Sequence, residues 1–158
     1  MNKPANYRFI FSILWIGFLL AISFMEAPMK FQAELVTLPI GLSVGRVIFS
    51  MLNKIEWVLL GLLLIAELLG PRSTGSMGLS LTALGILLLQ SFWLLPILDA
   101  RAEAIVGGAL LPGSNTHFYY LGMEVLKLTV LVLYTRAAIG LFQKQLSHQN
   151  FGLELKSG

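Results

Sequence analysis

Residues 9–25 have the sequence FIFSILWIGFLLAISFM, a run without any charged side chain. A helix needs about 20 predominantly apolar residues to cross the hydrocarbon core of a bilayer, so this run is long enough when its flanking residues are included. Three more apolar runs follow, at about residues 50–70, 77–98 and 117–142. The sequence therefore predicts an all-α fold, an integral membrane four-helix bundle in which residues 1–158 form a single transmembrane domain.

The composition is typical of a membrane protein. Of the 158 residues, 56% are hydrophobic and only 12% are charged, and the mean hydropathy is +0.80. A soluble domain carries about 25% charged residues. The chain has no cysteine, which excludes disulfides, thiolate metal sites and palmitoylation. The net charge of +3 favours orientation signals and contact with lipid headgroups over nucleic-acid binding, so no nucleic-acid partner is predicted.

Pro28 is expected to end the first helix, because a proline lacks the N–H that the helical hydrogen-bond ladder needs. Before the second apolar run, polar residues recur at i, i+3, i+7 and i+10, which is one face of a helix. These residues are Ser43, Arg46, Ser50 and Asn53. Either they belong to an amphipathic helix lying flat at the interface, or one bent helix turns them into the bundle. We therefore expect an additional amphipathic or re-entrant helical stretch near residues 35–52.

Charged and imidazole side chains concentrate at one end of the predicted bundle. An ionised side chain inside an apolar segment costs a few kcal/mol or more unless it is paired or hydrated, so such residues are candidates for a functional site. Three of them recur together with Tyr120 on one face of the fourth segment, at i, i+3, i+7 and i+10. The predicted binding cluster consists of Glu26, Arg46, Asn53, Glu56, Asp99, Arg101, His117, Tyr120, Glu124 and Lys127.

Two ion pairs are expected within this cluster. Arg46 lies in an otherwise apolar stretch, where a guanidinium seeks a carboxylate, and we expect it to form a buried pair with one of the acids. The alternative is that Arg46 extends to the lipid headgroups. Glu124 and Lys127 are three residues apart on one helix and are expected to pair directly.

No cofactor is predicted, and a metal site is the weaker alternative. His117, Glu124 and Glu56 offer one imidazole and two carboxylates, a set that suits iron, manganese or zinc. However, His117 and Glu124 are two helical turns apart, which is long for one ion. His148 lies at the opposite end, which disfavours a bis-histidine haem. No nucleophile-elbow, phosphate-loop or dinucleotide motif is present, so the catalytic residues of any enzyme are unknown.

Lysine and arginine counts predict the orientation. One end of the bundle has Lys3, Arg8, Arg72, Arg136, Lys144 and Lys156, and the other has Lys30, Arg46, Lys54 and Arg101. The positive-inside rule places the end with more basic residues in the cytoplasm. We therefore expect both termini in the cytoplasm, the charged cluster at the outer face, and a location in the bacterial inner membrane.

Two stretches resemble a known membrane family. They are Phe24-Met-Glu-Ala-Pro-Met-Lys-Phe31 and Gly41-Leu-Ser-Val-Gly-Arg-Val-Ile-Phe49. Both are similar to parts of a small four-helix membrane family of unknown function, which is itself similar to a eukaryotic transmembrane protein associated with cisplatin resistance. Asp99-Ala-Arg101 and His117-x-x-Tyr120 loosely resemble its third and fourth helices. The resemblance implies four helices and supplies no catalytic residue.

A weaker resemblance concerns Arg46, Asn53 and Glu56. Their spacing looks like the Arg, Asn and Glu signature of the membrane-associated eicosanoid and glutathione metabolism family, whose members are four-helix proteins of about this length and usually trimers. The fourth segment lacks the family's glutathione-site pattern of Arg and Tyr, and Arg136 lies at the wrong end.

The cluster favours a protein that binds or translocates a small polar or ionic solute at the outer face of the membrane. The first alternative is a structural or assembly subunit of a membrane complex, in which the charges pair with one another or with a partner. The second alternative is a membrane enzyme acting on a lipophilic substrate. The expected partners are the lipid bilayer, a small polar solute, and a second copy or another membrane subunit. Gly41 and Gly45 form a GxxxG pattern, which indicates close helix packing or dimerisation.

Overall fold

The computed structural model describes the backbone of residues 8–70 and 73–157, and the side chains in these ranges up to residue 147. The elements in chain order are α1 (Arg8–Leu19), η2 (Leu20–Glu26), α2 (Ala27–Met29), η3 (Lys30–Gln32), α3 (Leu38–Leu69), α4 (Thr74–Leu89), η4 (Gln90–Leu94), α5 (Leu95–Val106) and α6 (Thr116–Ser157). Among the residues placed, every regular element is helical. Lys3, Arg72 and the side chains of His148 and Lys156, used above, lie outside the described residues.

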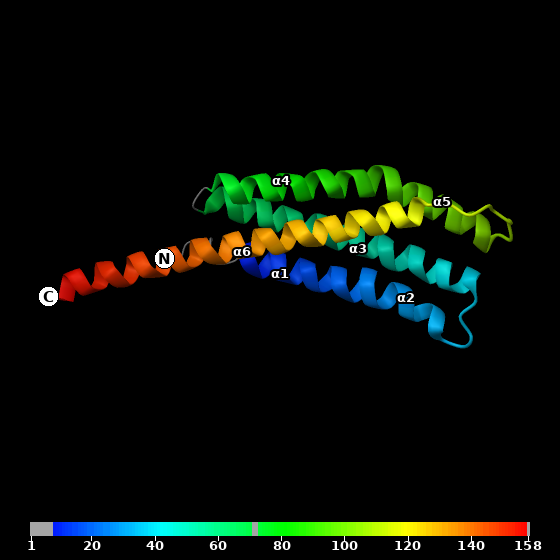
Figure 1. The fold of residues 1–158 in the computed structure, drawn as a ribbon, viewed down its shortest axis with the longest axis horizontal. Coiled ribbons are helices and arrows are strands. Elements are labelled where there is room, and N and C mark those ends of the chain that lie inside the picture. Colours follow the sequence, from blue (N-terminus) through cyan, green and yellow to red (C-terminus); the bar gives the residue numbers. More distant parts are fainter. Residues whose placement is uncertain (1–7, 71–72, 158) are drawn as a thin grey trace.

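These elements join into four long helices that run alternately in opposite directions (Figure 1). Each is long and apolar enough to cross a membrane: Arg8–Gln32, Leu38–Leu69, Thr74–Val106 and Thr116–Ser147. The first helix packs on α3 and α6, and the third, made of α4, η4 and α5, packs on the same two. The prediction of an all-α fold with four long helices is confirmed, and each helix extends beyond its predicted apolar run.

The stretch near residues 35–52 is not a separate helix. It is the first half of α3, which continues without a break for 32 residues and has Pro39 in its first turn, where a proline costs no hydrogen bond. Ser43 and Ser50 are exposed, whereas Gly41 and Gly45 are buried. The face of α3 that turns inward here is therefore the glycine face, and the polar stripe lies at its edge.

The first helix does not end at Pro28, contrary to the prediction. Its backbone stays helical to Gln32. A seven-residue π-helical segment, η2, lies immediately before α2, and the five-residue π-helical segment η4 precedes Pro96 in the same way. A π-turn changes the hydrogen-bond register of a helix, and this shift accommodates a residue that lacks an N–H and crowds the preceding turn. Both helices therefore pass their prolines and remain long.

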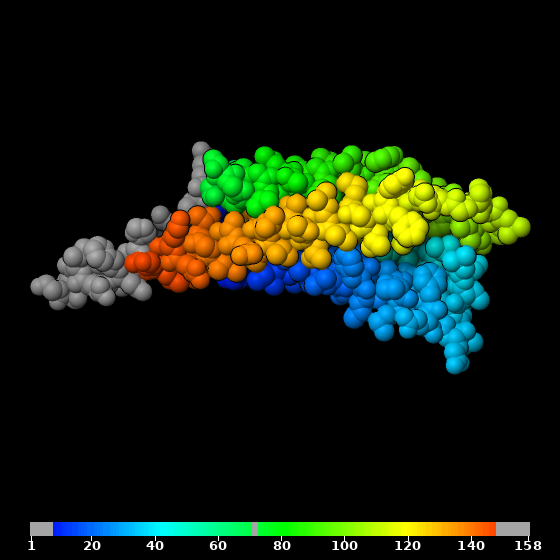
Figure 2. All heavy atoms as spheres, viewed as in Figure 1, coloured from blue at the N-terminus to red at the C-terminus, as the bar shows by residue number. Residues whose placement is uncertain are grey.

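Apolar side chains from all four helices meet along the middle of the molecule. Trp15 and Leu19 of α1, Leu60 of α3, Leu87 of α4 and Leu131 of α6 are fully or almost fully buried there. Figure 2 shows the helices in contact along their length, while the segment around residues 30–37 projects at one end. At this end the first helix diverges from the others (Figure 1), which leaves room for the site described next.

Candidate functional site

Three charged side chains meet in the interior of the molecule without any exposed surface. They are Glu56 of α3 and Glu124 and Lys127 of α6, which we call the buried triad. Lys127 Nζ lies 2.5 Å from Glu56 Oε1 and 3.0 Å from Glu124 Oε1. The predicted pairing of Glu124 with Lys127 is confirmed. The spacing of three residues places both on one face of α6, and α3 brings Glu56 against that face.

Uncharged side chains from the other helices complete the network. Trp15 Nε1 donates to Glu56 at 2.9 Å. Ser23 Oγ and Gln90 Nε2 donate to Glu124 at 3.0 and 2.8 Å. The third donor of the ammonium group goes to Gln90 Oε1 at 2.6 Å, so Lys127 uses its full donor capacity. Each of the four long helices therefore contributes to one hydrogen-bonded group.

The buried triad contains two carboxyl groups and one ammonium group. If both acids are ionised, it carries one negative charge too many. Among the described residues, Glu56 Oε2 is buried and has no hydrogen-bond partner. A buried polar atom without a partner costs its full desolvation energy, about 1–3 kcal/mol and more for a charged group. This excess negative charge must therefore be stabilised by the fold or neutralised by a ligand.

A cavity of about 420 Å³ lies beside the triad, where the first helix diverges. Its walls are mostly apolar and include four aromatic side chains. These are Phe24, Phe31, Phe49 and Tyr120. Glu124, which is fully buried, lines the inner end, and His117, which is exposed, lines the opening. The cavity therefore leads from the surface to one acid of the buried triad.

Arg46 and Asp99 form an ion pair at this opening. Arg46 Nε lies 2.7 Å from Asp99 Oδ1 and Nη2 lies 3.0 Å from Oδ2, the two-pronged geometry that suits a guanidinium and a carboxylate. Nη2 also donates to Glu103 at 3.1 Å. The expected pairing of Arg46 with an acid of the cluster is confirmed. The pair is not buried, however, since the two side chains are 29% and 45% exposed.

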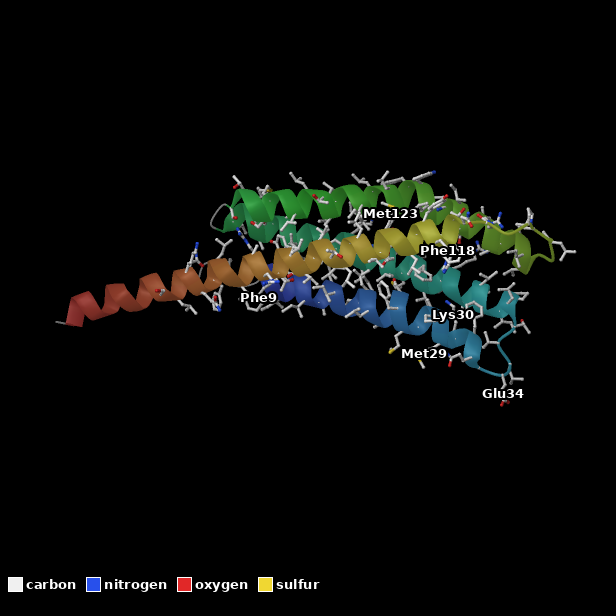
Figure 3. All side chains as sticks on the ribbon, in the orientation of Figure 1. Phe9, Met29, Lys30, Glu34, Phe118 and Met123 are labelled. Carbon is white, nitrogen blue, oxygen red and sulfur yellow. The ribbon has the colours of Figure 1, made fainter. Side chains whose placement is uncertain are left out.

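Lys30 lies at the cavity wall and was not among the predicted site residues. Its ammonium group is 3.4 Å from Glu26 Oε2, and 5.6 and 5.5 Å from the ring centroids of Phe31 and Phe49. In Figure 3, Lys30 lies on the side of its segment that faces α3, whereas Met29 points away from the helices. The spacing of Glu26 and Lys30 signals a helical pair, but only the fold shows that the lysine faces a cavity.

Gly41 and Gly45 make room for this segment. A methyl group on Gly45 would lie 2.9 Å from Lys30 Nζ, and one on Gly41 would overlap the ring of Phe31. The GxxxG pattern therefore serves close packing of α3 against the chain's own first helix.

Two of the remaining predicted residues, Asn53 and Arg101, lie apart from the triad. Asn53 donates to Ser91 Oγ at 2.7 Å, and Ser91 also accepts from Trp57 Nε1 at 3.0 Å, which ties α3 to the third helix. Arg101 donates to the carbonyl oxygen of Pro112 at 2.6 Å and holds the loop before α6. Tyr120 is buried beside the cavity. The structure thus brings together part of the predicted cluster and assigns Asn53 and Arg101 to structural contacts.

The metal alternative finds no support in the geometry. Among the described side chains, residues 8–70 and 73–147, no three His, Cys, Asp or Glu form a group that could hold a metal ion. His117 is exposed at the opening of the cavity, whereas Glu56 and Glu124 are fully buried. The imidazole and the two carboxylates therefore occupy different surroundings.

A second cluster of buried polar side chains lies at the opposite end of the molecule. Arg8, which is 1% exposed, donates to the carbonyl oxygens of Ala66 and Glu67 at 3.1 and 3.0 Å and thereby caps the last turn of α3. The carboxylate of Glu67 accepts from Ser80 at 2.8 Å and from Tyr134 at 3.3 Å. Arg8 therefore acts as a helix cap, in addition to any effect on orientation.

Neither a family model, nor a curated protein, nor a solved structure matches the chain. Both family resemblances stated above therefore stay predictions, and function is argued from the site.

Proposed function

We propose that the chain is an integral membrane protein whose four long helices span the bilayer. Their length and apolar composition support this, as do the large apolar side chains that each presents outward, among them Ile13, Val58, Phe92 and Leu126. The charged side chains of the triad lie inside, which is where a membrane protein keeps ionisable groups. From the lysine and arginine counts, both termini are cytoplasmic and the cavity opens at the outer face of a bacterial inner membrane.

We propose further that the protein binds, and in its membrane setting translocates, a small solute through this cavity. The observation that carries the proposal is the position of Glu124, which belongs to the buried triad and also lines the cavity. The volume of about 420 Å³ is within the usual range of small-molecule sites, roughly 300–1,000 Å³. Because the walls are mostly apolar, the solute has an apolar body together with a polar or charged group.

A structural or assembly subunit is the second candidate. It is favoured by the near-complete pairing inside the network, in which Lys127 and both oxygens of Glu124 have partners. It does not account for the cavity, or for the buried Glu56 Oε2 that has no hydrogen-bond partner among the described residues.

The absence of cysteine from the chain allows a direct test. Leu98 lines the cavity, and its neighbour Ile97 is exposed on the outside of α5. In lipid vesicles, Leu98→Cys should react with a small water-soluble thiol reagent, and Ile97→Cys should not. The apolar probe tert-butylbenzene should slow the labelling of Leu98→Cys. Equal labelling of both cysteines, or no protection by the probe, would refute a solute-binding cavity.

A further inference from the structure

At this end of the molecule, the ion pairs involve more acidic than basic side chains. Among the described residues, five ion pairs join three bases to five acids. The bases are Lys30, Arg46 and Lys127, and the acids are Glu26, Glu56, Asp99, Glu103 and Glu124. Acids at the surface are compensated by water and salt. The extra acid of the buried triad has no such compensation, because its side chains have no exposed surface.

The groups around the triad supply no further positive charge. Trp15, Ser23 and Gln90 approach it from the first and third helices and are uncharged. Lys127 is already shared between both acids. No described side chain of the network therefore supplies the second positive charge, and this charge must come from outside the network. The cavity reaches Glu124 and provides the route.

The cavity walls suit a cation. Aromatic rings attract cations through their negative faces, and four aromatic side chains line this cavity. Lys30 already demonstrates such contacts, with its ammonium group 5.6 and 5.5 Å from the centroids of Phe31 and Phe49. An apolar body would occupy the remaining wall, which is formed by leucine side chains such as Leu95 and Leu121.

We propose that the ligand is a small amphipathic organic cation, whose charge balances the extra acid of the buried triad at Glu124. This inference rests on the proposed solute-binding function and names its substrate class. Without the ligand, one proton on Glu56, whose buried Oε2 has no hydrogen-bond partner, supplies the same charge, because two bare carboxylates with one ammonium are costly to bury. Binding of the cation then releases this proton.

Other titratable groups lie near Glu124, and their charges also affect how readily the proton is released. Those in contact with the triad or lining the cavity are Lys30, Arg46, Asp99, His117, Tyr120 and Lys127, with Glu26 and Glu103 paired to them. Of the three bases in the described ion pairs, Lys30 has a single long contact, 3.4 Å, and its charge has the same sign as that of the ligand. Removing that charge should therefore favour a cation.

The test compares two probes of the same shape. Phenyltrimethylammonium is a permanent cation, and tert-butylbenzene is its uncharged counterpart. The cation should protect Leu98→Cys from labelling at a concentration about tenfold lower or less, because the carboxylate left when the proton is released attracts the cation and not its uncharged counterpart. The anion benzenesulfonate should not protect. Phenyltrimethylammonium carries no exchangeable proton, so a proton released into weakly buffered solution on its binding comes from the protein.

Charge variants made in the Leu98→Cys background show which side chains cause the preference for the cation over the uncharged probe. Glu124→Gln and Glu56→Gln each remove the extra acid, so each should abolish the preference for the cation while protection by tert-butylbenzene persists. Lys30→Met should strengthen protection by the cation several-fold. Lys54→Met removes the same charge from an exposed side chain of α3 that does not line the cavity, so it is the matched control and should leave the preference intact. Lys30→Met does not touch the triad, so it tests the proposal even where a glutamine variant fails to fold.

The outcomes separate this inference from the proposed function. Equal protection by both probes, or weaker cation binding in Lys30→Met, would overturn the cation inference and leave a solute-binding cavity in place. No protection by either probe would remove both. Cation binding without proton release would overturn the exchange at the triad.

Discussion

Gln90 donates a hydrogen bond of 2.8 Å to Glu124 from a π-helical segment, η4. Ser23 reaches the other oxygen of the same carboxylate from the other π-helical segment, η2. Each segment lies shortly before a proline, Pro96 or Pro28. π-Turns are rare and occur often at functional sites. Here two of them bring uncharged polar side chains onto one buried acid.

Lys127→Met should be strongly destabilising, since it leaves Glu56 and Glu124 buried beside each other without a counter-charge. Removing one partner of a buried pair typically costs about 3–5 kcal/mol. Thermal unfolding of the purified protein in detergent measures the loss. Lys144→Met is the control, because Lys144 is exposed and its substitution should change stability by about 0.5 kcal/mol at most. A small effect of Lys127→Met would mean that the triad is not a coupled unit.

Removing the charges together should be milder than removing one. In the variant that combines Lys127→Met with Glu56→Gln and Glu124→Gln, no charge is left in the interior, so unfolding should occur at a higher temperature than in Lys127→Met alone. A triple variant no more stable than the single one would show that the cost arises from lost shape and not from unpaired charge.

Arg46 and Asp99 should show only weak coupling in a double-mutant cycle of Arg46→Ala and Asp99→Asn. Both side chains are partly exposed, and exposed ion pairs typically contribute about 0.2–1 kcal/mol, with two-pronged geometry favouring the upper end of this range. Unfolding of the four proteins of the cycle gives the interaction energy. Coupling as large as that between Lys127 and Glu56 would contradict this expectation. Raised salt should weaken the coupling further.

Gly41→Ala should destabilise the protein, because the added methyl group overlaps the ring of Phe31 and this ring must shift from its packed position. Overpacking of this kind costs about 1–3 kcal/mol. Gly61→Ala on the same helix has open space around the new methyl group and should be neutral or stabilising by up to about 1 kcal/mol. Thermal unfolding distinguishes the two. If Gly41→Ala instead left stability unchanged and altered cross-linking between copies, the glycines would serve dimerisation.

The proposed topology has both termini on one side. Reporter fusions after Gly158 and within residues 107–115 should therefore report opposite sides of the membrane. Reports from the same side would rule out four spans.

Sequence periodicity was sufficient to predict the four long helices and the pairing of Glu124 with Lys127, because both depend on spacing along one chain segment. It placed Glu56 in the same cluster but could not predict that Glu56 contacts Lys127 directly, since the rotation of one helix against another depends on packing. Periodicity also left open which face of α3 turns inward. A stripe of polar residues drew attention to Ser43 and Ser50, whereas the buried face consists of Gly41 and Gly45, which carry no side-chain signal.

Proline misled the prediction of the first helix for a related reason. Taken alone, Pro28 predicts a helix end, and only the preceding π-turn allows the backbone to continue to Gln32. Gln90 lies in an apolar segment and could have been noticed by its polarity. Nothing in the sequence singles out Ser23 and Trp15, because serine and tryptophan are common in apolar helices of this kind.

The distribution of the triad between two helices has a consequence for the order of assembly. In the proposed membrane setting, helices enter the bilayer as separate units and associate afterwards. The last helix brings Glu124 and Lys127 together, 3.0 Å apart, and enters as a neutralised pair. The second helix brings Glu56 without a partner and must hold that acid protonated or near the interface until the last helix arrives. During synthesis the second helix is therefore without its partner until α6 docks. Docking of α6 completes both the charge network and the cavity.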